Sequence, residues 1–164
     1  PHSAPMRIAF ETARPGDIPT LAALWHSGWH EAHAAIVPEA LTKLRTLDSF
    51  ETRLARHLPA TRIARSGGRL LGFSVILGNE LYQLYVDPAA RGSGAAQALM
   101  RDAGEIIRQA GHPRAVLSCS IGNERAAHFY RKCGWTCTGK QDEDLEVPNG
   151  SFTLTVWRFE RALA

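Results

Sequence analysis

Residues 80–110 constrain the fold more than any other part of the sequence. Strand-forming residues over 80–86 are followed by a turn that contains Gly92 and Gly94, and a helical pattern runs from 94 to 110. The period of the apolar residues therefore changes from that of a strand to that of a helix within one short turn. We expect a strand that runs directly into a long helix, as in α/β structures.

The turn between this strand and this helix consists mainly of small residues. Gly92, Gly94, Ala95 and Ala96 leave main-chain N–H groups uncovered at a helix start, where they and the helix dipole can bind a phosphate. An ordinary tight turn is the alternative, because a Gly-x-Gly pair alone is weakly specific. A dinucleotide-binding fingerprint is excluded, since Gln97 stands where the third glycine is required.

The remaining segments predict a mixed sheet flanked by helices. Period-two patterns bounded by turn residues predict strands over residues 6–13, 61–66, 69–77, 114–119, 135–140 and 152–159. Helical patterns begin at Asp17, break or bend at Gly28, and recur after Pro38, over 48–59 and over 123–132. Three consecutive antiparallel strands in the middle of this order exclude a regularly alternating doubly wound fold.

Length and composition are those of an ordinary globular domain. The 164 residues suit one domain, assigned to residues 6–164, and the polar residues 1–5 are interpreted as a flexible leader or an expression remnant. With 45% hydrophobic and 21% charged residues, the chain is not a disordered segment, a collagen-like repeat or a disulfide knot. No apolar run approaches the ~18 to 20 residues that span a bilayer, and the first residues lack the charged-then-apolar order of a secretion signal. We therefore expect a cytoplasmic protein with no membrane partner.

The charge distribution disfavours a nucleic-acid partner. Lys and Arg number 19 against 16 Asp and Glu, which gives a formal net charge of +3. The positive charges are scattered from Arg7 to Arg161 rather than gathered into one basic stripe. We therefore expect no nucleic acid among the ligands.

Neither the cysteines nor the histidines predict a metal centre. Cys119, Cys133 and Cys137 lack the two-residue gap of a zinc knuckle or a redox site, and are interpreted as free thiols. His30 and His33 lie three positions apart, whereas the zinc-protease helix signature needs four. We therefore expect no metal.

Two motifs resemble those of the GCN5-related N-acetyltransferase (GNAT) superfamily. The run Arg91-Gly92-Ser93-Gly94-Ala95-Ala96 matches the Arg/Gln-x-x-Gly-x-Gly/Ala loop of that superfamily. The run Asn123-Glu124-Arg125-Ala126-Ala127-His128-Phe129-Tyr130-Arg131-Lys132-Cys133-Gly134-Trp135 resembles its Asn, Ala, Phe-Tyr and Gly-aromatic block. The likeness covers residues 6–160 and is strongest over 80–135.

The resemblance implies a fold and a cosubstrate. The fold is a central, mostly antiparallel, twisted sheet of about seven strands, with the fourth and fifth strands splayed apart and about four to five helices around it. Acetyl-coenzyme A is the implied acetyl donor. Its pantetheine arm would lie between the splayed strands and bond the main chain of Leu84, Tyr85 and Val86, and Asn123 would contact it from the other side. The diphosphate would lie on the N–H groups of Arg91, Gly92, Ser93, Gly94, Ala95 and Ala96.

The implied reaction is direct attack of a primary amine, from a small molecule or a peptide, on bound acetyl-CoA without an acyl-enzyme. By the resemblance, Tyr130 gives a proton to the departing sulfur, and an N–H near Leu84 or Tyr85 polarises the carbonyl. Packing in the core is the alternative role for Tyr130. Cys119 is interpreted as a buried apolar residue rather than a covalent relay.

Glu80 is the candidate for accepting the proton of the amine, because related enzymes often place a carboxylate at the start of this strand. Strict alternation would put Glu80, Tyr82 and Leu84 on one face, so that Glu80 and Tyr82 could both line the acceptor side. A solvated turn carboxylate is the alternative for Glu80.

The acceptor pocket in this family is built from the first helices and the loop between them. Trp29, His30 and His33 fall in that segment and are the candidate walls of the pocket, with core packing as the alternative for the tryptophan. The alternative function is a catalytically silent acyl-CoA-binding sensor or interaction domain, since the cofactor loop fits both. The exposed edge expected for the final strand, 152–159, favours a homodimer.

Overall fold

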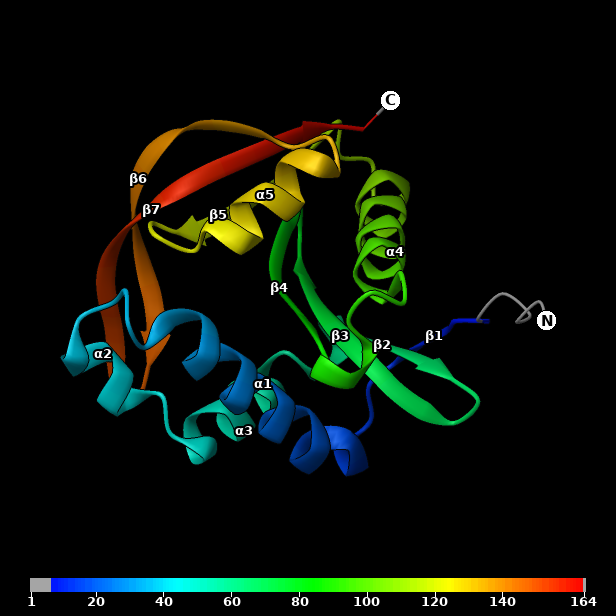
Figure 1. The fold of residues 1–164 in the computed structure, drawn as a ribbon, viewed down its shortest axis with the longest axis horizontal. Coiled ribbons are helices and arrows are strands. Elements are labelled where there is room, and N and C mark those ends of the chain that lie inside the picture. Colours follow the sequence, from blue (N-terminus) through cyan, green and yellow to red (C-terminus); the bar gives the residue numbers. More distant parts are fainter. Residues whose placement is uncertain (1–6, 164) are drawn as a thin grey trace.

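The computed structural model describes residues 7–163, and the leader assigned to residues 1–5 lies outside the described residues (Figure 1). Its strands are β1 (Ala9–Thr12), β2 (Thr61–Ser66), β3 (Arg69–Leu77), β4 (Glu80–Val86), β5 (Arg114–Ser120), β6 (Thr136–Val147) and β7 (Gly150–Ala162). Its α-helices are α1 (Ile18–His33), α2 (Glu39–Leu44), α3 (Leu47–Arg56), α4 (Ala95–Gln109) and α5 (Glu124–Lys132). The mixed α/β element order expected from the sequence is confirmed.

The strands form one sheet in the order β1-β2-β3-β4-β5-β7-β6. Every neighbouring pair is antiparallel except β4 and β5, which are parallel. β4 and β5 pair at a single position, Glu80 opposite Val116, and then diverge. The predicted seven-stranded sheet with splayed fourth and fifth strands is therefore confirmed.

Helices cover both faces of the sheet (Figure 1). On one face, α1 and α3 bury Trp25 and Phe50 against Phe73 of β3. On the other face, α4 and α5 pack on the sheet, with Leu99 and Phe159 fully buried. Burial of a large apolar side chain contributes about 1.5–3 kcal/mol to the free energy of unfolding, so these two layers hold the sheet in place.

The sequence pattern predicts a break or a bend at Gly28, and the break is wrong because α1 is continuous from Ile18 to His33. A Cβ atom at Gly28 would lie 2.7 Å from Cδ1 of the Tyr85 ring on β4, which is closer than any side chain tolerates. Gly28 therefore permits a close approach between helix and sheet, at a cost of about 1 kcal/mol in helix propensity. The glycine marks a contact rather than a helix end.

β6 and β7 form a hairpin longer than the sequence indicated. The strands predicted over 135–140 and 152–159 extend to Thr136–Val147 and Gly150–Ala162 and pair along almost their whole length. The expectation of a free edge on the final strand is wrong, because β7 lies between β5 and β6. The outer edge on this side of the sheet belongs to β6.

A bulge interrupts β4, so the predicted strict alternation is also wrong. Ile76 pairs with Leu81 and Val75 with Gln83, which leaves Tyr82 as the extra residue. Tyr82 packs on the layer formed by α1 and α3, whereas Leu84 packs on the α4 side. Tyr82 and Leu84 therefore occupy opposite faces.

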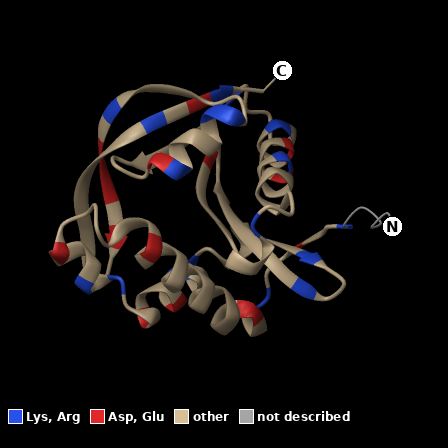
Figure 2. Ribbon diagram, in the orientation of Figure 1, with Lys and Arg blue, Asp and Glu red and all other residues tan. Residues whose placement is uncertain are grey.

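Charged residues are distributed over most elements, with acidic and basic side chains interspersed (Figure 2). Lys and Arg occur on the β2–β3 hairpin, on α4 and α5, and along β6 and β7, and do not form a single stripe (Figure 2). The scattered distribution of positive charge expected from the sequence is therefore seen in the fold.

Candidate functional site

A cleft of about 1030 Å³ opens where β4 and β5 diverge. It is lined by residues of α1, β4, the turn before α4, β5, α5 and β6. Of the residues singled out from the sequence, it is lined by Trp29, His33, Glu80, Tyr82, Leu84, Tyr85, Val86, Arg91, Gly92, Ser93, Gly94, Ala95, Ala96, Asn123 and Tyr130. One cleft therefore brings together nearly every candidate residue.

His30 is the exception among these candidates. Its Nε2 lies 2.7 Å from the main-chain oxygen of Arg45, and the residue is not part of the cleft lining. The geometry gives His30 a place in tying α1 to the segment after α2. The prediction that it contacts the acceptor has no support from the cleft.

The turn before α4 is shaped for an anion. Gly92 and Gly94 have φ angles of +79° and +89°, in the left-handed region that favours glycine. Gly94 is the N-cap of α4, so the first N–H groups and the positive end of the helix dipole point toward the turn. Ala95 and Ala96 add only methyl groups beside them.

The hydrogen bonds of the turn show which N–H groups can bind a ligand. Acceptors within the turn are already bonded to the N–H groups of Arg91, Ser93 and Ala95. Within the described part of the chain, no acceptor is bonded to the N–H groups of Gly92, Gly94 and Ala96. Uncovered N–H groups at a helix start are what a diphosphate requires.

Beyond Glu80, the edge of β4 that faces β5 makes no strand pairing with any described residue along the cleft. The N–H of Asp87 donates to Leu71 O at 2.8 Å, which fixes the groups that face β3. Because these groups alternate along a strand, Leu84 and Val86 direct theirs toward the gap beside β5, while those of Tyr85 face β3. An extended chain lying in the gap can bond to Leu84 and Val86, and Tyr85 contributes its ring.

α5 brings Asn123 and Tyr130 to the same cleft. Asn123 caps the helix, with its Oδ1 accepting from the N–H of Ala126 at 3.3 Å. The Tyr130 ring packs against Phe159 and Trp135, with centroid distances of 5.7 and 6.5 Å. Burial raises the pKa of the Tyr130 phenol, so the hydroxyl keeps its proton at neutral pH and can donate it.

Glu80 lies where β4 and β5 still pair. Burial and, second, the neighbouring carboxylate of Glu143 raise the pKa of Glu80 to about 7, against the opposing effect of Arg158. A carboxyl group with this pKa is partly ionised at neutral pH and can both accept and release a proton. Glu143, which accepts a hydrogen bond from Ser118, also lines the cleft and was not anticipated from the sequence.

Aromatic side chains form the wall beside α1. Trp29 stacks on His33 with a centroid distance of 5.1 Å, and Phe73 stacks on Tyr85 at 6.0 Å. Burial lowers the pKa of His33 to about 4, so its imidazole is neutral at physiological pH. The His33 side of this wall is therefore neutral, and the nearby positive charge is that of Arg45, whose guanidinium carbon lies 5.7 Å from the centroid of Trp29.

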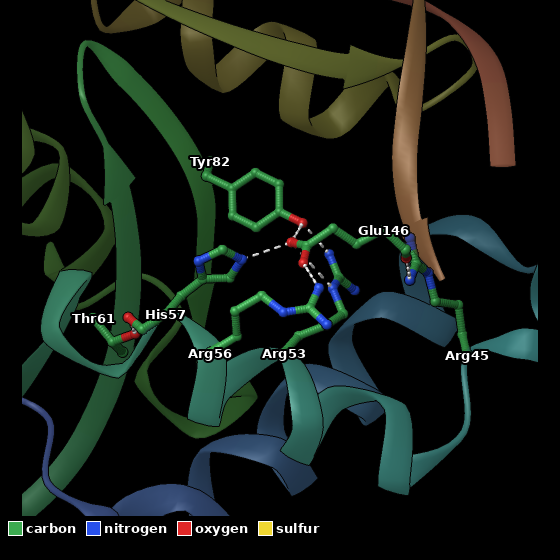
Figure 3. Close-up of polar contacts among 7 residues, drawn as sticks. All are labelled: Arg45, Arg53, Arg56, His57, Thr61, Tyr82 and Glu146. Atoms are coloured by element: carbon green, nitrogen blue, oxygen red, sulfur yellow. Dashed lines mark hydrogen bonds and ion pairs between the residues drawn. The ribbon is translucent and has the colours of Figure 1, made fainter. Parts of the chain in front are cut away.

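Figure 3 shows a cluster of charged residues around Glu146. Its Arg45 lies beside the wall, over the ring of Trp29. The Glu146 carboxylate accepts from the Tyr82 hydroxyl, from Arg56 and from His57, and the Arg45 guanidinium donates to the main-chain oxygen of Glu146. Burial alone would raise the pKa of Glu146, but the hydrogen bonds from Tyr82, His57 and Arg56 outweigh burial and lower the pKa to about 2.

Arg45 and Arg53 line the cleft and were missed by the sequence analysis. Arg53 lies on the apolar stripe of α3 between Phe50 and Leu54, and a charge at such a position was the one available signal. No pattern marks Arg45 or Glu146.

Cys119 keeps its proton. Burial and, second, Glu124 raise the pKa of its thiol to about 11, which disfavours a nucleophilic thiolate. Within residues 7–163, no cluster of three or more His, Cys, Asp and Glu side chains has a geometry that could hold a metal ion. In the same residues, no helix is long and apolar enough to cross a bilayer.

Comparisons with known proteins agree with this geometry. The model of the acetyltransferase (GNAT) family matches residues 23–135. Uncharacterized N-acetyltransferases of Mycobacterium tuberculosis and Mycobacterium bovis are 31% identical over 114 residues, which cover 64% of this chain and 73% of theirs. The peptidyl-lysine N-acetyltransferase YjaB of Escherichia coli is 26% identical over 145 residues, 87% of this chain and 92% of its own.

Solved structures share the fold. A GCN5-related N-acetyltransferase from Rhodopseudomonas palustris has a TM-score of 0.75 and 21% identity, over 99% of this chain and 100% of the other. The PaiA N-acetyltransferase of Thermoplasma acidophilum, solved in complex with coenzyme A, has a TM-score of 0.66 and 20% identity over 96% of this chain and 99% of the other. With a family model that matches more than half of its length, the chain belongs to the GNAT family of acetyltransferases.

Proposed function

We propose that this protein is an acetyl-CoA-dependent N-acetyltransferase in which a primary amine, of a small molecule or a peptide, attacks bound acetyl-CoA directly. One observation carries the proposal. The cleft between β4 and β5 runs past uncovered main-chain N–H groups, a protonated phenol and a carboxyl group with a pKa of about 7. These are the groups that an acetyl transfer from a thioester to an amine needs.

The residues present fit coenzyme A. The uncovered N–H groups of Gly92, Gly94 and Ala96 suit a diphosphate, and the unpaired main chain of Leu84 and Val86 suits the amide groups of a pantetheine arm. Asn123 lines the opposite side of the same cleft. When bound, acetyl-CoA supplies the thioester whose carbonyl carbon the amine attacks.

The side chains then manage two protons. Glu80 accepts the proton that the amine loses as it attacks, directly or through water, because its carboxyl group is partly ionised near pH 7. Tyr130 donates its phenolic proton to the departing sulfur. Main-chain N–H groups of β4 beside the gap polarise the carbonyl. Cys119 takes no covalent part, since its thiol stays protonated.

The alternative is a silent acyl-CoA-binding domain, which would use the same turn. The protein is titrated calorimetrically with acetyl-CoA and with CoA, and thiol release from acetyl-CoA is then measured with a panel of amines. Binding heat together with amine-dependent thiol release supports the proposal. Binding without release from any amine supports the silent domain, and no heat with either coenzyme overturns both.

The proposed reaction does not depend on where the protein is located or on its oligomeric state. A cytoplasmic location and a homodimer stay predictions, and the edge that a second copy would meet is that of β6 rather than the final strand. The peptidyl-lysine activity named for the Escherichia coli relative supports including peptide amines in the panel.

A further inference from the structure

Two buried arginines line the cleft beside the aromatic wall. Arg45, which follows α2, is 2% exposed, and Arg53 on α3 is 5% exposed. Arginine is almost never buried to this extent unless its charge is paired, because removing an ion from water costs several kcal/mol. These two guanidinium groups therefore require anionic or hydrogen-bonding partners inside the protein or in a ligand.

Some N–H donors of Arg45 and Arg53 have no hydrogen-bond acceptor among the described residues. Arg53 donates from Nη2 to the Tyr82 hydroxyl at 2.8 Å, and its Nε lies 4.0 Å from the Glu146 carboxylate, beyond hydrogen-bond distance. Arg45 donates from Nη1 to the main-chain oxygen of Glu146. Within the described chain, three buried N–H positions have no acceptor, namely Nε of Arg45 and Nε and Nη1 of Arg53.

The charges do not balance either. Among the described residues, the ion pairs of the cluster involve one carboxylate, that of Glu146, which also serves Arg56 and His57 (Figure 3). Arg56 is 58% exposed and is solvated by water. The two buried guanidinium groups therefore face one carboxylate, and the buried cluster has an excess of about one positive charge.

Burial and the excess positive charge of the cluster both lower the pKa of Arg45. Burial and, second, repulsion by Arg53 lower the pKa of Arg45 to about 10, against the opposing effects of Tyr82, Tyr85 and Glu146. Arg53 also lies over aromatic rings, with its guanidinium carbon 4.2 Å from the centroid of Trp25. Aromatic faces attract a cation but accept no conventional N–H···O bond, so the unused donors stay available to a ligand.

We infer that Arg45 and Arg53 form a subsite for a carboxylate, so that the acetyl acceptor is an amine whose molecule also carries a carboxylate group. The inference rests on the proposed function, which it deepens. One negative charge balances the buried excess, whereas a phosphate brings close to two. Guanidinium groups bind carboxylates through paired, charge-assisted hydrogen bonds, and three N–H positions are free to make them.

The subsite belongs to the same cleft as the reacting groups. Tyr82 hydrogen-bonds Arg53 and lies two residues from Glu80 on β4. Tyr85 lines the same cleft and is close enough to both arginines for their charges to act on its hydroxyl. An acceptor held by its carboxylate at Arg45 and Arg53 can therefore extend its amine toward Glu80 and the thioester.

The test compares matched acceptors on the unmodified protein. The panel contains L-α-amino acids, β-alanine and γ-aminobutyrate, which vary the spacing of amine and carboxylate, each beside its own carboxamide. It also contains phosphoethanolamine and a lysine peptide that has no acidic residues and an amidated C-terminus, so that it carries no carboxylate. Thiol release gives kcat/KM, and calorimetry on CoA-loaded protein gives affinity without turnover. We expect at least one carboxylate to exceed its carboxamide about tenfold or more in both measurements.

Variants connect the preference to the two arginines. Arg45→Met and Arg53→Met keep the length of the side chain and remove the charge, and we expect each to abolish most of the tenfold preference. Arg56→Met is the matched control, because Arg56 pairs with the same Glu146 but is exposed and does not line the cleft. It should keep the preference. If a Met variant does not fold, Arg53→Lys keeps the charge and is expected to keep a reduced preference.

The outcomes separate the inference from the proposed function. Equal use and equal binding of carboxylates and carboxamides overturn the inference and leave acetyl transfer standing. Preference for phosphoethanolamine or for the lysine peptide over every carboxylate overturns it as well. Binding of carboxylates that depends on Arg53, without turnover of any amine, supports the subsite and overturns the proposed transfer.

Discussion

The two ends of the cleft are built in opposite ways. The end proposed for the cofactor consists of main-chain N–H groups and small side chains from one continuous stretch, with two glycines at positive φ. The end proposed for the acceptor consists of large aromatic and charged side chains from α1, the segment after α2, α3, β4 and β6. A main-chain site recognises a group common to many ligands, whereas a side-chain site can be changed one residue at a time to select among ligands.

The largest effect is expected at the junction of the two ends. Tyr130→Phe removes the proton donor and should lower kcat by about 10³-fold while leaving the CoA dissociation constant unchanged. Steady-state kinetics and calorimetry give the two values. Tyr82→Phe is the matched control, and it should raise KM for the amine rather than lower kcat. Equal losses of kcat in both variants would show that Tyr130 acts through packing.

Glu80→Gln tests whether Glu80 serves the chemistry of the acceptor. The wild-type kcat/KM should rise with pH through an apparent pKa near 7 and then level off, because Glu80 must be ionised to accept a proton. The variant should be about 10²-fold slower at pH 8 and lose this limb of the profile. An unchanged profile would assign the limb to another group, such as the amine itself.

The same variant, Glu80→Gln, should lose activity but gain thermal stability at high pH. A folded-state pKa above that of the unfolded chain means that ionised Glu80 destabilises the fold. This cost is absent below about pH 4.5 and complete above about pH 7. Glu80→Gln should therefore raise Tm at pH 8 and leave it unchanged at pH 4. A thermal scan at both values checks this, and a lower Tm at pH 8 would contradict the buried environment of Glu80.

A smaller effect is expected from a single methyl group at the cofactor end. Gly94→Ala and Gly68→Ala form a matched pair, since the two glycines have φ of +89° and +80° and neither has an atom within 4 Å of an added Cβ. Each should lower the free energy of unfolding by about 1–2 kcal/mol through backbone strain. Only Gly94→Ala should weaken CoA binding, by about tenfold. Equal weakening by both would mean that the turn before α4 does not hold the diphosphate.

The smallest effect is expected at Cys119. Cys119→Ala should change kcat by less than about twofold, because a thiol whose pKa is raised to about 11 is not a nucleophile at neutral pH. Assays of thiol release and CoA affinity decide the point. Loss of turnover with intact CoA binding would replace direct attack by an acyl-enzyme.

The cofactor end could be anticipated from the sequence because it is local. The turn residues from Arg91 to Ala96 are contiguous, and Asn123 and Tyr130 belong to one short motif. The order of the elements also predicted the mixed sheet, and the resemblance to the GNAT superfamily predicted its diverging strands. In each case the determining interaction lies within a few residues along the chain, or within one supersecondary unit.

The acceptor end could not be anticipated for the converse reason. Glu146 meets Arg45 and Arg56 across separations of 101 and 90 residues, and no local pattern encodes such a meeting. The bulge at Tyr82 changes which side chains of β4 lie on each face of the sheet, and no glycine or proline within the strand indicates it. The sequence around Gly28 predicted a helix break or bend because the residue that requires a glycine there, Tyr85, lies on a strand far along the chain.

The β6–β7 hairpin sets the order in which the two ends can be completed. The turn before α4 needs only the chain up to α4, whereas Arg45, Arg53 and Tyr82 acquire Glu146 only after β6 has been synthesised and has docked. Closing so long a loop is slow relative to forming a local turn. A nascent chain can therefore form the turn proposed for the diphosphate before it can complete the cluster around Glu146, so the end proposed for the acceptor is the last part of the cleft to be completed.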